Sequence, residues 1–136
     1  MIAYYYICNG SILDCFLIGV VYRYTVSLHR TWTINSFAHI FGDQHYSKSV
    51  GGRDVFRLQH LFMYGIGEGW HNYHHSFPWD YKMSEFGWRW NVCGFFIDCM
   101  AAIGQAYDLK TASPELVKRH KLRVAKGELH DEDKSY

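Results

Sequence analysis

The chain has 136 residues, of which 49% are apolar, 18% aromatic and 20% charged, a composition that predicts one domain and excludes a wholly disordered chain. The formal net charge is only +1, so net charge provides no polyanion-binding face and we expect no nucleic-acid partner. The nine histidines are unusually many for a chain of this length and require an explanation. The four cysteines form no CxxC pair, which predicts free thiols in a reducing compartment.

The N-terminal segment is apolar and almost uncharged. Residues 1–22 contain no Lys or Arg and a single acid, Asp14. Residues 12–28 are mostly apolar, and about 20 such residues suffice to cross a bilayer. Asp14 counts against a span, because a charge in mid-membrane costs on the order of 3 kcal/mol, so an amphipathic helix in a soluble core is the alternative. If the segment spans, the basic residues after it place the C-terminus in the cytosol.

We expect this helix to continue to about residue 41. The following stretch contains no Pro, and Gly42 is a typical C-terminal stop. Roughly 30 helical residues are about 45 Å long, which exceeds the ~30 Å hydrocarbon core, so the last turns emerge from the lipid. Trp32, Asn35 and His39 lie there at spacings of three and four, on one helix face.

The highest density of potential metal ligands lies in residues 67–81, GEGWHNYHHSFPWDY. His71, His74 and His75 occupy positions i, i+3 and i+4, so one helical turn would direct three imidazoles to the same side. Imidazole binds iron, zinc and copper, and no cysteine is near enough for a zinc finger. The pattern predicts a catalytic metal, with the Glu68 carboxylate orienting an imidazole from behind. The alternative is a run of surface histidines that bind nothing.

In the rest of the chain, the sequence predicts a polar loop over 42–54, a short apolar helix from residue 55 and two later helices. Residues 91–107 are apolar but too few for a comfortable span, with Asp98 near the centre, which favours a buried or interfacial helix. Ser113 as cap and Pro114 at the first position begin a helix that ends near Gly127. The other histidines match no ligand pattern and are expected to be structural or exposed: His29, His45, His60, His120 and His130.

Three blocks resemble the membrane acyl-CoA desaturases of the stearoyl-CoA Δ9 type. They are RTWTINSFAH (30–39), GEGWHNYHHSFPWDY (67–81) and FFIDCMAAIGQAYD (95–108), in the family's order. The resemblance implies an all-α, integral membrane, histidine-box di-iron fold of the endoplasmic reticulum. Here it would comprise a transmembrane helix (about 11–41), the C-terminal half of a cytosolic helical cap (42–126) and a polar tail (127–136). The family inserts a cis double bond into a saturated fatty acyl-CoA, using O2 and electrons from cytochrome b5.

Transferred residue by residue, the resemblance implies a set of iron ligands and one substrate contact. Asn35 would bind through a water and Trp32 would lie near the acyl chain, while four histidines bind iron directly: His39, His71, His74 and His75. Two irons need about ten donors, so these residues make about half a site. The family's other histidine boxes have no counterpart here, because HxxHH occurs once and HxxxxH does not occur.

We therefore expect the C-terminal portion of a desaturase, a truncated product or a partial gene model, that is inactive alone. Two other interpretations stay open. One is another membrane histidine-box oxygenase, such as a fatty-acid hydroxylase. The other is a non-catalytic membrane pseudo-subunit that keeps the scaffold without a complete site.

Overall fold

We describe the protein from a computed structural model that covers residues 11–55, 68–86 and 91–128. Within these ranges the chain is helical and forms no strand, which confirms the all-α prediction. The chain divides into two units, residues 1–35 and residues 36–136, which are treated separately below. The apolar helix predicted from residue 55 lies outside the described residues.

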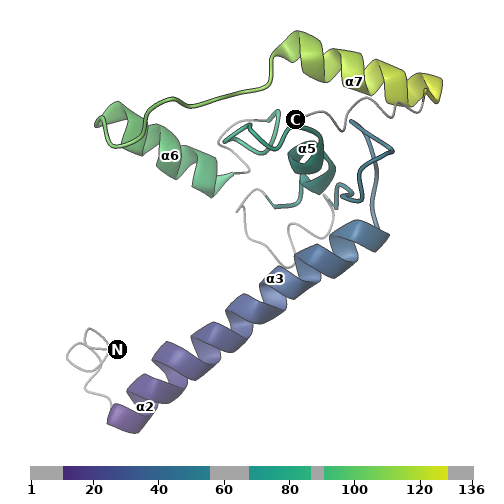
Figure 1. The fold of residues 1–136 in the computed structure, drawn as a ribbon. Coiled ribbons are helices and arrows are strands. Elements are labelled where there is room, and N and C mark those ends of the chain that lie inside the picture. The colour runs from purple at the N-terminus through teal and green to yellow at the C-terminus, as the bar shows by residue number, and fades with distance from the viewer. Residues whose placement is uncertain (1–10, 56–67, 87–90, 129–136) are drawn as a thin grey trace. The chain divides into compact units, whose positions relative to one another are not determined.

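The long N-terminal helix runs without a break through α2 (Ile12–Phe16), the π-helical segment η1 (Leu17–Tyr22) and α3 (Arg23–Ile40) (Figure 1). Its 29 residues from Ile12 to Ile40 make it, in the described part of the chain, the one helix long and apolar enough to cross a membrane. At 1.5 Å per residue it is about 43 Å long, close to the length expected from the sequence.

Asp14 belongs to the start of this helix and not to its middle. The Ser11 side chain accepts a hydrogen bond from the Asp14 N–H, and the Asp14 carboxylate accepts hydrogen bonds from the N–H and hydroxyl of Ser11. This reciprocal capping box satisfies free donors of the first turn, where a negative charge also interacts favourably with the helix dipole. Asp14 therefore lies in the first turn of the helix, where it serves as a capping residue.

The helix ends at Ile40, just before Gly42, close to the predicted stop. Gly42 adopts a positive φ of 114°, and a Cβ atom at this position would lie 2.4 Å from the carbonyl oxygen of Asp54. Directly after it, Asp43 and Asp54 exchange two backbone hydrogen bonds of 3.0 and 2.7 Å. A glycine is needed here because the chain turns sharply and passes close to another backbone segment. The pair of bonds closes the predicted polar loop.

In the described residues of the second unit, three helices follow: α5 (His71–Ser76), α6 (Val92–Ala102) and α7 (Pro114–Lys126). The ends of α7 match the sequence prediction. Ser113 accepts a hydrogen bond from the Leu116 N–H at 3.2 Å, and Gly127 closes the helix in the left-handed conformation. A small aromatic core joins α5, α7 and the polar loop through Tyr46, Trp70, Tyr73, Phe77 and Val117.

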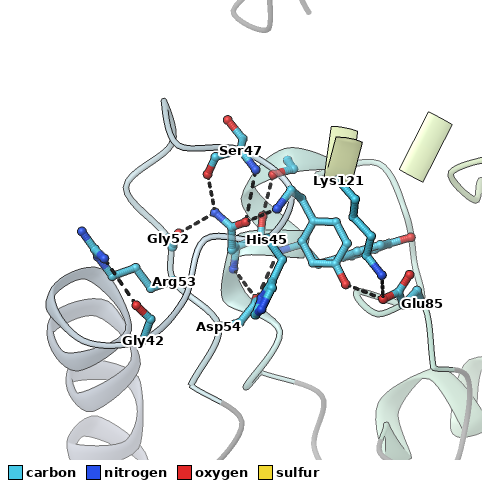
Figure 2. A network of polar contacts seen from close by, with 12 residues as sticks. Gly42, His45, Ser47, Gly52, Arg53, Asp54, Glu85 and Lys121 are labelled. Atoms are coloured by element: carbon cyan, nitrogen blue, oxygen red, sulfur yellow. Dashed lines mark hydrogen bonds and ion pairs between the residues drawn. The ribbon is translucent and has the colours of Figure 1, made fainter. Parts of the chain in front are cut away.

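Tyr46 attaches α7 to the polar loop. Its hydroxyl donates a hydrogen bond of 2.8 Å to Glu85, and Lys121 of α7 forms an ion pair with the same carboxylate (Figure 2). His120 is buried, with its ring 4.9 Å from that of Phe77 and its Nδ1 atom 3.3 Å from the Tyr46 carbonyl oxygen. His120 is thus a structural histidine, one of the two roles expected for it.

Asn72 is the centre of the polar network in the second unit. Its side chain is fully buried, and its oxygen accepts hydrogen bonds from the N–H groups of Tyr46 and Ser47 at 2.8 and 3.2 Å. Its amide nitrogen donates to the carbonyl oxygens of Ser47 and Gly52, both at 2.8 Å. One amide thereby satisfies four backbone groups of the loop and holds it against α5 (Figure 2).

Asp54 binds the other side of the same helix. Its carboxylate accepts a hydrogen bond of 2.9 Å from the N–H of Asn72 and lies 3.1 Å from Nδ1 of His45. Burial raises the pKa of Asp54, and the bonds from His45 and the backbone oppose that shift. The loop is therefore fixed to the first turn of α5 from two directions.

We expect Asn72→Ala to lower the free energy of unfolding by more than about 3 kcal/mol, because four buried backbone groups lose their partner at once. Urea titration of the detergent-solubilised chain, followed by near-ultraviolet circular dichroism, measures the loss. Gln44→Ala is the matched control in the same loop, since it removes a single bond, to the Val50 carbonyl oxygen, and should cost about 1 kcal/mol. Equal losses for the two variants would contradict the central role of Asn72.

Candidate metal centre

Three of the predicted histidines converge in the second unit. His39 comes from the last turn of α3, and His71 and His75 come from one face of α5. The Nε2 atom of His71 lies 2.9 Å from Nε2 of His39 and 3.1 Å from Nε2 of His75. One ligand nitrogen from each residue lies within 4.8 Å of the other two. Residues 32 positions apart in the sequence thus present their donor atoms to one point.

The donor set fits a transition-metal ion. Two nitrogen ligands about 2.1 Å from one ion, and at right angles to each other, lie about 3 Å apart, which matches both observed separations. Hydrogen bonds alone do not satisfy this arrangement, because Nε2 of His71 carries either one proton or one lone pair and has two imidazole nitrogens beside it. Imidazole nitrogens suit iron, zinc and copper alike, so the geometry indicates a metal centre without selecting the metal.

His71 is held in the neutral form that a metal ligand requires. Its side chain is buried, and its Nδ1 atom has no hydrogen-bond partner in the described part of the chain. Burial, together with the nearby His75 and His39, lowers the pKa of His71 to about 4. Burial and the neighbouring histidines also lower the pKa of His75. A neutral imidazole has a nitrogen lone pair that can coordinate a cation, so these histidines are in the form that binds a metal ion.

His74 and Glu68 stand apart from this group of three. The ring of His74 is centred 6.1 Å from that of His71 and 5.7 Å from that of His75, and its Nδ1 atom is buried without a described partner. Buried polar atoms normally have a partner, so the Nδ1 atom of His74 is available to bind a second ion. No hydrogen bond joins Glu68 to a histidine within residues 68–86. Their predicted roles therefore stay predictions.

The two residues predicted upstream of His39 belong to the first unit. Trp32 is 58% exposed on α3, with its ring 6.1 Å from that of His29. The side-chain amide of Asn35 donates a hydrogen bond of 2.8 Å to the carbonyl oxygen of Thr31, one turn earlier. This bond orients the amide along the helix and leaves its oxygen free to accept. Substrate contact by Trp32 and water-mediated binding by Asn35 also remain predictions.

Two adjacent glycines pack against the histidine rings. A Cβ atom on Gly52 would lie 2.4 Å from Cδ2 of His75 and 2.6 Å from the carbonyl oxygen of His71. On Gly51 it would lie 3.0 Å from Nδ1 of His39. The sequence analysis missed this feature and treated the glycines as ordinary loop residues. The only available signal was the Gly-Gly pair itself, which does not say what lies beside it.

Comparison with known proteins shows which proteins this chain is similar to. No protein-family model matches the chain. It is 42% identical over 124 residues to the acyl-CoA Delta-12 desaturase of Tribolium castaneum, 41% identical over 123 residues to the acyl-CoA Delta-9 desaturase of Acheta domesticus, and 40% identical over 123 residues to the stearoyl-CoA desaturase of Homo sapiens. The chain is homologous to acyl-CoA desaturases. Each alignment covers 90% of this chain but only 33 or 34% of the relative, so the chain spans about a third of their length.

The close packing of Gly52 generates a prediction. Gly52→Ala should weaken metal binding by roughly tenfold or more, because the added methyl group must displace the His75 ring or the α5 backbone. Anaerobic titration of the detergent-solubilised chain with Co2+, followed by absorbance, measures the affinity. Gly51→Ala is the control, since the His39 ring can yield by a few tenths of an ångström and the loss should be smaller. The reverse order of effects would be incompatible with this packing.

Proposed function

We propose that this chain supplies part of the di-iron centre of an acyl-CoA desaturase that inserts a cis double bond into a saturated fatty acyl-CoA. The observation that supports it is the convergence of three imidazole nitrogens from α3 and α5 in a desaturase homologue. Residues His39, His71 and His75 would hold one iron directly. His74 would contribute to the second iron, and Asn35 would bind through a water.

The bound iron would supply the oxidising power to remove hydrogen from unactivated methylene groups, which acid–base side chains cannot do. Overall, dioxygen is reduced to water with electrons from the acyl chain and from cytochrome b5. The protein groups described here position and protect the site. Burial keeps His71 neutral, and the network around Asn72 holds the loop that carries the two glycines against the ligands. Trp32 would line the path of the acyl chain and Glu68 would orient an imidazole.

The donors in this chain are too few for two irons. Two ions at five or six ligands each require about ten donors, and four histidines with one asparagine-held water provide about half of them. We infer that the remaining ligands come from residues outside these 136, and that the chain alone does not desaturate. An acyl chain would also lack most of the walls that hold a methylene group in position, and misplacement by about 1 Å can cost a hundredfold in rate.

The proposal covers the reaction class and the metal centre. The relatives named for Delta-12 and Delta-9 activity are 42% and 41% identical to the chain over nearly the same length, so these identities favour neither double-bond position.

A chimaera tests the proposed function. The chain replaces its 123-residue counterpart in the stearoyl-CoA desaturase of Homo sapiens, and the product is expressed in a host without its own desaturase. Growth without added unsaturated fatty acids is expected from the chimaera and not from the chain alone, because only the chimaera has a complete ligand set. Growth supported by the chain alone would refute the ligand count. Hydroxylated instead of unsaturated lipids, or an inert chimaera that still binds iron, would refute desaturation.

Two histidine variants of the chimaera test the ligand assignment. His75→Ala should abolish unsaturated product and remove a large share of the bound iron, because it deletes one of three convergent nitrogens. His45→Gln should leave both nearly unchanged, because this exposed residue lies outside the cluster and contacts Asp54. Iron content by elemental analysis and fatty-acid chromatography provide the two readouts. A similar loss of iron from both variants would contradict the assignment.

We also propose that the chain resides in the endoplasmic reticulum membrane with its C-terminus in the cytosol. All 14 basic residues lie at or after Arg23, and Lys and Arg favour the cytosolic side. A glycosylation acceptor appended after Tyr136 should remain unmodified in microsomes, as shown by an unchanged electrophoretic mobility. The same acceptor placed before Met1 should be modified, and modification only at the C-terminus would reverse the orientation.

A further inference from the structure

Two neighbouring residues of the polar loop, Arg53 and Asp54, bind the ends of two different helices. The Arg53 N–H donates a hydrogen bond of 2.7 Å to the carbonyl oxygen of Ala38, in the last turn of α3. The Arg53 guanidinium donates a further bond of 3.3 Å to the carbonyl oxygen of Gly42, just beyond that helix (Figure 2). The last carbonyls of a helix have no partner within it, and a cation is favourable beside them. Arg53 thus closes the end of the helix that carries His39.

Asp54 has the opposite task at the start of α5. The first N–H groups of this helix have no intrahelical acceptor, and the indole of Trp70, at the N-cap position, has no oxygen to offer them. The buried carboxylate of Asp54 accepts bonds of 2.9 and 3.4 Å from the N–H groups of Asn72 and Tyr73. Hydrogen bonds to a charged acceptor are stronger than neutral ones. The carboxylate therefore fixes the first turn of α5, which begins with His71.

The two attachments are one residue apart in the chain, which leaves little freedom between the two helix ends. Consecutive Cα atoms are about 3.8 Å apart. The histidines that the two helices bring together are 32 positions apart, yet the Nε2 atoms of His39 and His71 lie within 2.9 Å of each other. Asp54 is itself held by two backbone hydrogen bonds with Asp43. The shortest covalent link between the two ligand-bearing helices is therefore also a well-anchored one.

We propose that Arg53 and Asp54 are positioning residues of the histidine cluster. Together they hold the end of α3 and the start of α5 at the separation at which the nitrogens of His39 and His71 meet. They act through the two helices and not as metal ligands. Metal–nitrogen distances vary by only about 0.2 Å, so a small change in this separation would remove one histidine from a shared ion. The geometric role concerns the metal-free chain, and only its consequence for binding rests on the metal centre proposed above.

Spin labels in the metal-free, detergent-solubilised full chain test the separation directly. Native cysteines are replaced by Ser, and labels are attached to Ile40→Cys, at the end of α3, and to Pro78→Cys, two residues after α5, because both positions are exposed. Electron paramagnetic resonance gives the distribution of distances between them. Asp54→Ala should broaden or shift this distribution, because the first turn of α5 loses its acceptor. Asp43→Ala is the matched control, an exposed acid of the same loop whose backbone bonds to Asp54 the substitution keeps.

Titration of the same variants with Co2+, followed by visible absorbance, tests the consequence for a metal. Asp54→Ala should weaken binding by roughly tenfold or more, as is typical when a group that orients metal ligands is lost. It should also alter the Co2+ absorption bands, because water replaces a displaced imidazole. Asp54→Asn keeps an oxygen beside α5 but loses the charge, so its loss should be smaller, about threefold. Arg53→Gln should also have a smaller effect than Asp54→Ala, because the backbone bond to Ala38 remains.

A folded Asp54→Ala chain with an unchanged distance distribution would overturn the proposal, and so would equal broadening in Asp43→Ala. Should Asp54→Ala fail to fold, Asp54→Asn decides, since its distribution should lie between that of the wild type and a disordered pair of helices. An unchanged distribution in that variant would overturn the proposal equally. A wild-type chain that binds no Co2+, while Asp54→Ala still broadens the distances, would refute the metal centre and support the positioning role.

Discussion

The histidine cluster depends on one amide side chain. Asn72 lies directly after His71, and its buried amide binds two N–H groups and two carbonyl groups of the polar loop. The fourth of these bonds holds Gly52, the residue that packs against His75. The amide therefore fixes α5 and the loop behind the histidines in a single arrangement. A carboxylate could not replace it, since it has no N–H to donate.

Around this amide, the charges and the apolar groups have separate roles. Asp54 binds the first turn of α5 through its carboxylate, while Tyr46, Tyr73 and Phe77 form the aromatic core on the other side of the loop. The rings of Tyr46 and Tyr73 meet edge to face with centroids 5.0 Å apart. Hydrogen bonds thus determine the position of α5 and its histidines, and aromatic packing supplies the apolar burial that stabilises this position.

The sequence predicted the local features of this protein well, because they are encoded in short patterns. Ser113, Pro114 and Gly127 mark the ends of α7, and the spacing of His71 and His75 places both rings on one side of α5. Long-range features had no such signal. Nothing in the sequence pairs Asn72 with Ser47, or Gly52 with His75, since their contact depends on how the loop folds back. His74 differs for a geometric reason: three residues along a helix turn a side chain by about 300°, so its ring diverges from that of His71.

The bonded pair Asp43 and Asp54 also bears on how the second unit assembles. The pair closes a loop of 11 residues along the chain, whereas the contact between His39 and His71 closes one of 32. Because loop-closure entropy grows with the logarithm of length, the shorter loop is favoured by about 1 kcal/mol. The polar loop is thus the entropically easier part to form first, and it provides the backbone groups that Asn72 later binds. The scaffold behind the histidine cluster can in this way be ordered before the histidines meet.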